Sequence, residues 1–148
     1  MRAVSRLAKV VPVDPRRGVI SSLAFAAAVL DQGHNLIWYP EGGISKDGKL
    51  QDFKPGIGLL LMHYPVLIVP TWIDGTFEAL PAGKMIPRRR KITVSFGEPI
   101  EARELVGRTT AAEKNDNSKQ QKHHARIAKK LKTHVAHLGK HAGTVAEN

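Results

Sequence analysis

Short apolar runs alternate with segments of helical periodicity along the chain, and this alternation limits the possible folds more than any other feature. The runs Asn35–Tyr39 and Val66–Ile73 contain no charged residue, which is typical of strands that are buried on both faces. Around them, apolar residues recur at the spacing of a helical face. Strands separated by helices require crossover connections, so we predict an α/β fold with a mainly parallel sheet and flanking helices. The helical residues are Val19, Leu23, Ala26 and Leu30 before the first run, and Ile57, Leu59, Leu60, Leu61 and Met62 between the two runs.

Prolines and glycines mark where these elements begin and end. Val10–Val13 reads as a short strand, and a helix is predicted to begin near Asp14, with a proline in its first turn. Gly33 is a suitable residue to end that helix. Residues 75–90 contain two glycines and two prolines, which predicts a loop. The alternation of polar and apolar residues in Lys91–Phe96 then predicts an outer strand.

The C-terminal part of the chain differs in charge. Residues 107–148 carry nine Lys and Arg against three Asp and Glu, whereas residues 1–106 carry 14 against 10, so most of the net charge of +10 lies near the C-terminus. Residues 107–121 read as a polar hinge, and a narrow apolar stripe between basic residues follows them. We therefore predict an α/β domain over residues 1–106 and, over residues 107–148, a hinge with a basic amphipathic helix. The stripe consists of Ile127, Leu131, Val135 and Leu138.

Composition and length exclude several classes of protein. The chain has no cysteine, which excludes disulfides, thiol catalysis and thiolate metal sites. No apolar run approaches the roughly 20 residues that cross a bilayer. Three basic residues among the first nine interrupt any signal-peptide core. We expect a cytoplasmic protein, with peripheral contact at the cytoplasmic face of the membrane as a further expectation.

The histidines do not predict a metal site. His134, His137 and His141 fall on one helical face, but no acidic residue or cysteine joins them. The segment is rich in lysine, and positive charge disfavours a bound cation. We expect a solvated helix face here and no metal.

An acidic residue and two glycines directly follow the first apolar run, in the stretch Trp38-Tyr39-Pro40-Glu41-Gly42-Gly43-Ile44-Ser45. A carboxylate at the open end of a strand is costly to leave unpaired, and glycines let a backbone approach a ligand closely. The segment Glu41–Phe53 therefore predicts a functional loop. The alternative is that Glu41 caps a neighbouring helix or pairs with a lysine.

This stretch resembles a motif of a known family. Tyr39-Pro40-Glu41-Gly42 is similar to the Phe-Pro-Glu-Gly motif of the phospholipid and glycerol acyltransferases related to lysophosphatidic acid acyltransferase. Phe53-Lys54-Pro55-Gly56 is similar to the Phe-Lys-x-Gly continuation of that family. Val66–Ile73 resembles the family's fourth block, a hydrophobic strand with an internal proline. Phe96-Gly97-Glu98-Pro99 resembles its closing Phe-Gly-x-Pro.

The resemblance covers residues 10 to about 105 in the family's order, and it implies a glycerolipid-acyltransferase-like domain that is incomplete at its N-terminus. It implies transfer of a fatty acyl group from acyl-CoA or acyl-carrier protein to the hydroxyl of a lysophospholipid or glycerol phosphate. Acyl-CoA or acyl-carrier protein would be a co-substrate, and no other cofactor is implied.

The resemblance also implies which residues bind the acceptor phosphate. The family usually has an arginine before the last serine of this block, and Ile44 stands there in this chain. Phosphate contact would then come from elsewhere, such as Lys46 or the arginines that follow Asp14-Pro15, where the family's second block ends. The substrate-binding candidates are Glu41, Gly42, Gly43, Ser45, Arg16 and Arg17.

The family's catalytic base is a histidine that is followed, five residues later, by the aspartate that orients it. None of the seven histidines has that spacing, so no catalytic residue can be assigned. We expect either that the chain is the distal part of a longer enzyme or that the protein is inactive. Three readings follow: an acyltransferase of phospholipid metabolism, an inactive lipid-surface binding protein that retains the phosphate pocket, and a nucleic-acid binder attracted by the basic charge.

Overall fold

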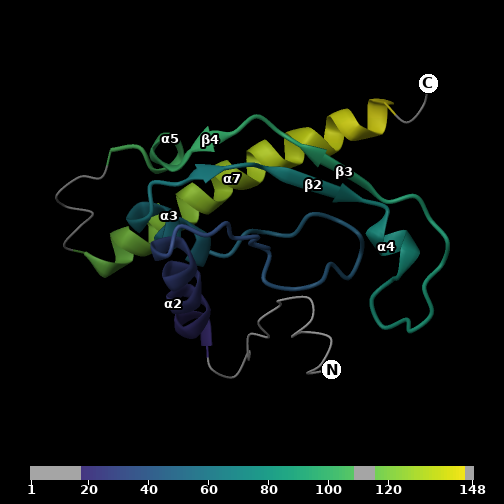
Figure 1. The fold of residues 1–148 in the computed structure, drawn as a ribbon, viewed down its shortest axis with the longest axis horizontal. Coiled ribbons are helices and arrows are strands. Elements are labelled where there is room, and N and C mark those ends of the chain that lie inside the picture. Colours follow the sequence, from purple (N-terminus) through teal and green to yellow (C-terminus); the bar gives the residue numbers. More distant parts are fainter. Residues whose placement is uncertain (1–17, 109–115, 146–148) are drawn as a thin grey trace. The chain divides into compact units, whose positions relative to one another are not determined.

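A computed structural model of the chain describes residues 18–108 and 116–145 (Figure 1). The chain divides into two units, Met1–Ile37 and Trp38–Asn148. Helix α2 belongs to the first unit, and the other described helices and the strands belong to the second.

Helix α2 (Gly18–Asp31) consists mainly of small and apolar residues, as its periodicity predicted. It ends where expected, because Gly33 has a φ of +72°, a conformation that glycine adopts without a Cβ penalty. The backbone N–H of Gly33 donates to Leu30 O at 3.0 Å, and the N–H of His34 donates to Val29 O at 3.1 Å. The predicted start of this helix and the strand predicted before it lie outside the described residues.

Helices α3 (Gly56–His63), α5 (Ala102–Val106) and α7 (Asn117–Val145) supply most of the core of the second unit, and each packs against the other two. The apolar stripe predicted from the sequence lies on the inner face of α7, where Ile127 is fully buried. The buried apolar side chains on these helices are Ile57, Leu60, Leu61, Ala102, Leu105, Ile127, Ala128, Leu131 and Val135.

The predicted hinge is too long, since residues 117–121 already belong to α7. Asp116 explains the earlier start: its carboxylate Oδ1 accepts the backbone N–H of Ser118 at 2.9 Å and that of Lys119 at 3.3 Å. An aspartate that satisfies the first backbone donors in this way is a helix N-cap.

The strands form two short antiparallel pairs. β2 (Thr71–Asp74) pairs with β3 (Thr93–Phe96), and β1 (Leu67–Ile68) pairs with β4 (Ile100–Glu101). The chain thus has the helices and strands of a mixed α/β structure. The mainly parallel sheet that we predicted is not seen among the described strands, because each strand of the apolar run pairs with a strand that returns from the next loop.

The two pairs are consecutive stretches of one hairpin, which is interrupted at Pro70. Proline has no N–H to donate to a ladder, and here residues 69–70 lie opposite residues 97–99, one more residue on the second strand. The N–H of Gly97 donates to Pro70 O at 2.8 Å and links the two stretches. Beyond β1, the N–H of Ala102 donates to Val66 O at 3.0 Å.

The strand predicted over Asn35–Tyr39 has no partner among the described strands. This segment forms no ladder: Ile37 is 84% exposed, and Leu36 and Trp38 are only half-buried. The apolar composition was read as burial on both faces, but no described strand provides the backbone partner that a β-ladder needs.

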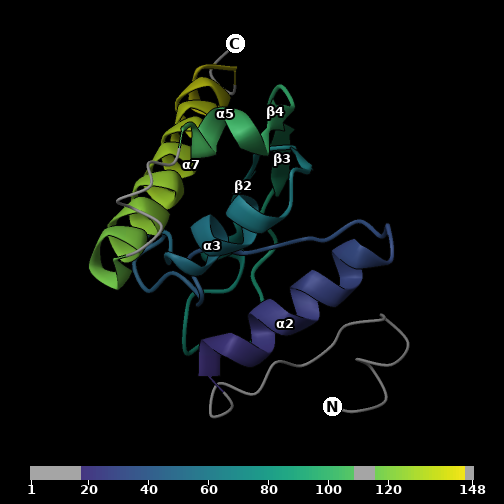
Figure 2. The same cartoon turned by 90° about the vertical axis from the view of Figure 1, so that its left-hand side faces the viewer.

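Helix α7 covers one face of the β2–β3 pair (Figure 2). The contact is close because glycines face it: a Cβ at Gly139 would lie 2.7 Å from the indole of Trp72, and one at Gly97 would lie 3.1 Å from the side chain of Leu138. The basic C-terminal helix is therefore part of the core of the second unit.

Candidate functional site

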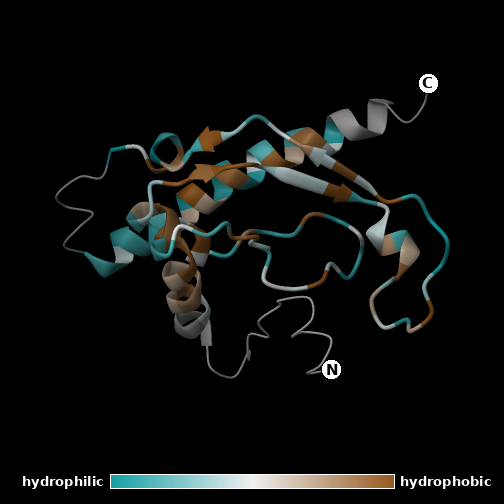
Figure 3. Cartoon of the chain, in the orientation of Figure 1, coloured by the Kyte–Doolittle hydropathy of each residue, from teal (hydrophilic) through white to brown (hydrophobic). Residues whose placement is uncertain are grey.

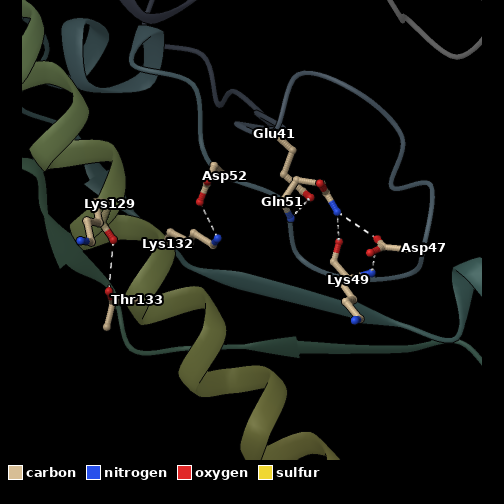
Figure 4. Close-up of polar contacts among 8 residues, drawn as sticks. All are labelled: Glu41, Asp47, Lys49, Gln51, Asp52, Lys129, Lys132 and Thr133. Atoms are coloured by element: carbon tan, nitrogen blue, oxygen red, sulfur yellow. Dashed lines mark hydrogen bonds and ion pairs between the residues drawn. The ribbon is translucent and has the colours of Figure 1, made fainter.

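Residues 41–54, which we call the Glu41 loop, contain most of the residues predicted to bind substrate. Two hydrogen bonds close the loop at its base, and Figure 4 shows the one between Glu41 and Gln51. The backbone N–H of Lys54 donates to Pro40 O at 2.8 Å, and the N–H of Gln51 donates to the Glu41 carboxylate Oε2 at 2.6 Å. Glu41 is half-buried. Its carboxylate thus fixes the width of the loop and leaves Oε1 without a hydrogen bond to any described residue.

A second network holds the far part of the loop. The Asp47 carboxylate Oδ1 accepts the backbone N–H of Lys49 at 3.1 Å and the side-chain amide of Gln51 at 3.0 Å. The hydroxyl of Ser45 lies 3.0 Å from Lys49 O and 3.2 Å from the same Asp47 oxygen, so its one proton is directed into the loop. The bond from the backbone of Lys49, assisted by Ser45, lowers the pKa of Asp47 below its ordinary value.

The glycines of the loop differ in their surroundings. Gly42 has a φ of +72°, and a Cβ there would lie 3.3 Å from Cγ of Lys54, so the Lys54 side chain extends over this backbone. Gly43 has open space where a Cβ would be. Gly48 has a φ of +76° and packs so closely on Phe77 of α4 (Thr76–Ala79) that a Cβ would lie 2.9 Å from the ring.

A shallow groove of about 540 Å³ runs between the end of the Glu41 loop and one face of α7. The ammonium of Lys132 crosses it and donates to the Asp52 carboxylate at 2.7 Å (Figure 4). The groove is lined by Asp52, Phe53, Ala125, Lys129, Lys132, Thr133, Ala136, His137 and Lys140.

The charge of this groove is positive, since three lysines face one carboxylate. The hydrogen bond and charge of Lys132 lower the pKa of Asp52 below its ordinary value, and Lys129 and Lys54 act in the same direction. Asp52 is therefore ionised at neutral pH, and it pairs with Lys132, so the lysines of the lining outnumber its carboxylates. The remaining positive charge suits an anionic group such as a phosphate.

The structure brings four of the six predicted substrate-binding residues into one loop. Gly42 and Gly43 present exposed backbone, Ser45 is turned inward, and Glu41 is held by its bond to Gln51. The other two candidates, Arg16 and Arg17, lie outside the described residues. Which of these residues contact a substrate stays a prediction.

The groove could not be predicted from the sequence, because the sequence does not decide whether the basic helix packs on the core. Asp52 and Lys132 are 80 residues apart, and no local pattern joins them. The sequence of the helix did contain a signal for the groove. One face of the helix combines two alanines, which leave room for a groove, with Lys129, Lys132 and Lys140.

Among the described residues, no group of three or more histidines, aspartates and glutamates could hold a metal ion. In the same part of the chain, no helix combines the length and the apolar character needed to span a bilayer.

The Glu41 loop lies within the part of the chain that a family model matches. The sequence model of the acyltransferase family matches residues 1–74. The 1-acyl-sn-glycerol-3-phosphate acyltransferase of Limnanthes douglasii is 32% identical over 87 residues, which are 59% of this chain and 31% of that protein. The enzyme of the same name from Cocos nucifera is 33% identical over 87 residues, 59% of this chain and 28% of its own. The chloroplastic 1-acyl-sn-glycerol-3-phosphate acyltransferase LPAT1 of Arabidopsis thaliana is 36% identical over 89 residues, 60% of this chain and 25% of its own.

The chain therefore spans less than a third of the length of these curated relatives. No solved structure matches it significantly.

Proposed function

The chain belongs to the acyltransferase family, and from this premise we propose that it serves phospholipid biosynthesis by acylating a lysophospholipid or glycerol phosphate. The names of the relatives suggest 1-acyl-glycerol-3-phosphate as the acceptor. We propose acyl-CoA or acyl-carrier protein as the donor, no other cofactor, and a cytoplasmic location.

The observation that carries the proposal is the construction of the Glu41 loop, which lies within the segment matched by the family. The loop is closed by Glu41, and it presents the backbone of Gly42 and Gly43 to solvent. Exposed glycine backbone lets an anionic group approach closely. Lys54 supplies a cation beside Gly42, whereas Ile44 stands where the resemblance places an arginine. These features support binding of the acceptor phosphate.

The groove beside the loop supports the same proposal. Lys129, Lys132 and Lys140 line it, and Lys132 is anchored to the residue that follows Gln51. A cationic groove next to the glycines has the charge needed for the further phosphates of an acyl-CoA or for the acidic surface of a carrier protein.

The assay that tests the proposal mixes the purified chain with acyl-CoA and 1-acyl-glycerol-3-phosphate and follows release of CoA. We expect turnover that falls at least tenfold in Glu41→Gln, because the amide weakens the charge-assisted bond to Gln51 N–H and alters the loop. Glu104→Gln in α5 is a control that changes one exposed carboxylate outside the loop. A chain that neither turns over nor binds the acceptor would refute the proposal.

A second candidate is an inactive lipid-surface protein that retains the phosphate pocket. It is favoured by the lack of any histidine followed five residues later by aspartate. It predicts saturable binding of 1-acyl-glycerol-3-phosphate, lost in Glu41→Gln, with no release of CoA. Steady CoA release that depends on the chain would rule this candidate out.

We also propose the parallel sheet that the sequence predicted. The apolar segment Asn35–Tyr39 forms no ladder with a described strand, and it has the composition of an interior strand. We propose that a parallel strand of the acyltransferase domain pairs with it. Slow hydrogen exchange at its backbone amides would support such pairing, and exchange at the rate of an open chain would contradict it.

A further inference from the structure

Residues 80–92, which we call the docking loop, join α4 to β3 and are held at their base by two backbone contacts. The N–H of Arg88 donates to Ala79 O at 2.6 Å, which closes the loop behind α4. Gly75, with a φ of +81°, lies directly against the backbone carbonyl of Lys91. Within the loop the N–H of Lys84 donates to Pro81 O at 3.0 Å and forms a turn. The loop is therefore a shaped projection whose base is fixed to Ala79 of α4 and to Gly75, which precedes α4.

Two large apolar side chains lie at the far end of this projection. Met85 is 94% exposed and Ile86 is 82% exposed. Figure 3 shows this apolar stretch in the loop after α4, followed by a hydrophilic stretch on the return to β3. Neighbouring apolar side chains this open to water are unfavourable in a soluble surface, and they indicate a partner that covers them.

The hydrophilic stretch is entirely basic. It consists of Arg88, Arg89, Arg90 and Lys91, and Lys84 precedes the apolar pair. All five side chains are exposed. The docking loop contains no acidic residue. None of these five cations forms an ion pair with another residue in the part of the chain that the structure describes. Their charge is thus available to a polyanion.

We propose that the docking loop binds the surface of an anionic lipid bilayer. Met85 and Ile86 enter the boundary between headgroups and acyl chains, and the arginines bind lipid phosphates above them. A nucleic acid would satisfy the arginines, but it has no apolar layer for Met85 and Ile86, and the docking loop has no aromatic residue on which a base could stack. The combination of apolar tip and basic flank therefore favours a bilayer.

The docking loop is also connected to the candidate site. Phe77 of α4, two residues before the closing Ala79, packs against Gly48 at the far part of the Glu41 loop. Figure 1 shows both loops meeting at α4. A protein bound to a bilayer through the docking loop would carry the Glu41 loop close to the lipids that it is proposed to use.

The absence of cysteine in the chain allows a direct test with a single label. Met85→Cys is labelled with an environment-sensitive fluorophore and mixed with vesicles of equal parts phosphatidylcholine and phosphatidylglycerol. We expect a blue shift and higher intensity, because the label enters an apolar layer. Gln121→Cys, an exposed position on α7, is the matched control and should show neither change. Vesicles of phosphatidylcholine alone should give a much weaker response.

The basic flank is tested by co-sedimentation with the same vesicles. Arg89→Gln/Arg90→Gln should weaken binding about tenfold or more, and added salt should weaken it further. Lys119→Gln/Lys122→Gln removes two exposed charges from α7 and should weaken binding far less. Met85→Ser/Ile86→Ser should weaken binding without changing its salt dependence.

The proposal would be overturned if the chain did not bind anionic vesicles, or if the label at position 85 stayed in water while the chain was bound. Equal losses of vesicle binding in the two charge variants would also overturn it. So would a preference of the chain for a single-stranded oligonucleotide over vesicles. Vesicle binding needs no acyl transfer, so it fails or succeeds separately from the proposed function. Conversely, acyl transfer to a water-soluble short-chain acceptor should be the same in Arg89→Gln/Arg90→Gln as in the unaltered chain.

Discussion

Lys132 of α7 donates to the Asp52 carboxylate at 2.7 Å and thereby ties the C-terminal helix to the end of the Glu41 loop. Asp52 is exposed, so the solvent screens this pair, and its contribution to stability is small. Its effect on the charge of Asp52 can nevertheless be measured.

Lys132→Gln should raise the pKa of Asp52 toward its ordinary value, because the cation that favours the carboxylate is gone. Carboxyl NMR titration measures this directly. In the unaltered chain the folded-state pKa is the lower one, so the pair stabilises the fold above the ordinary carboxyl pKa of about 3.9 and loses this effect as the pH falls through the folded pKa. An Asp52 titration that does not change in Lys132→Gln would contradict the assigned contact.

Gly58→Ala should destabilise the chain by about 2–3 kcal/mol, because the new methyl group overlaps the backbone carbonyl of His124 where α3 meets α7. Neither backbone can move without separating the two helices. Urea denaturation followed by circular dichroism measures the loss. Gly43→Ala is the matched control, since nothing lies near its Cβ, and it should change the free energy of unfolding by less than about 0.5 kcal/mol.

Gly48→Ala and Gly83→Ala form a second matched pair. Both glycines have positive φ, of 76° and 82°, so each alanine should cost about 1 kcal/mol in backbone strain. Only the Cβ at position 48 also meets a ring, that of Phe77. Gly48→Ala should therefore be the more destabilising of the two. When Gly48→Ala is added to Phe77→Ala, its cost should fall to that of Gly83→Ala. Equal effects of the two single substitutions would show that the loop does not pack on α4.

The stability of the chain should fall as the pH is lowered through the histidine range. Burial, together with the charges of His123 and His63, lowers the pKa of His124 below the ordinary value of about 6.5. The unfolded state then binds more protons than the folded state between the two pKa values, so stability is full above about pH 6.5 and falls toward the folded pKa. Urea denaturation at several pH values should show this slope, and His124→Gln should reduce it. A slope unchanged in His124→Gln would assign it to other groups.

Helices α3 and α7 and the family could be predicted from the sequence, because their signals are local, whereas the short helices α4 and α5 were not predicted. The Pro55–Gly56 start and the apolar residues of α3 lie next to each other in the chain, and so do the residues of the Glu41 loop. The pairing of strands could not, since it depends on which strands are close in space. The run Val66–Ile73 has the composition of a parallel strand, yet Pro70 divides it and both halves pair antiparallel with the segment that returns after the docking loop.

The charge of α7 does not decide where this helix packs. The stripe of Ile127 and Leu131 buries one side of the helix and leaves Lys132 to reach Asp52. Net charge describes how a segment meets water and polyanions, but it does not exclude the segment from a core.

The hydrogen bonds of Ser45, Asp47 and Gln51 join residues of the Glu41 loop to one another. The backbone entropy of this segment is therefore lost when the chain folds, and little of it remains to be lost when a ligand binds. Binding at Gly42 and Gly43 should show a small unfavourable conformational entropy, and its affinity should depend on contacts with the ligand and not on ordering of the loop.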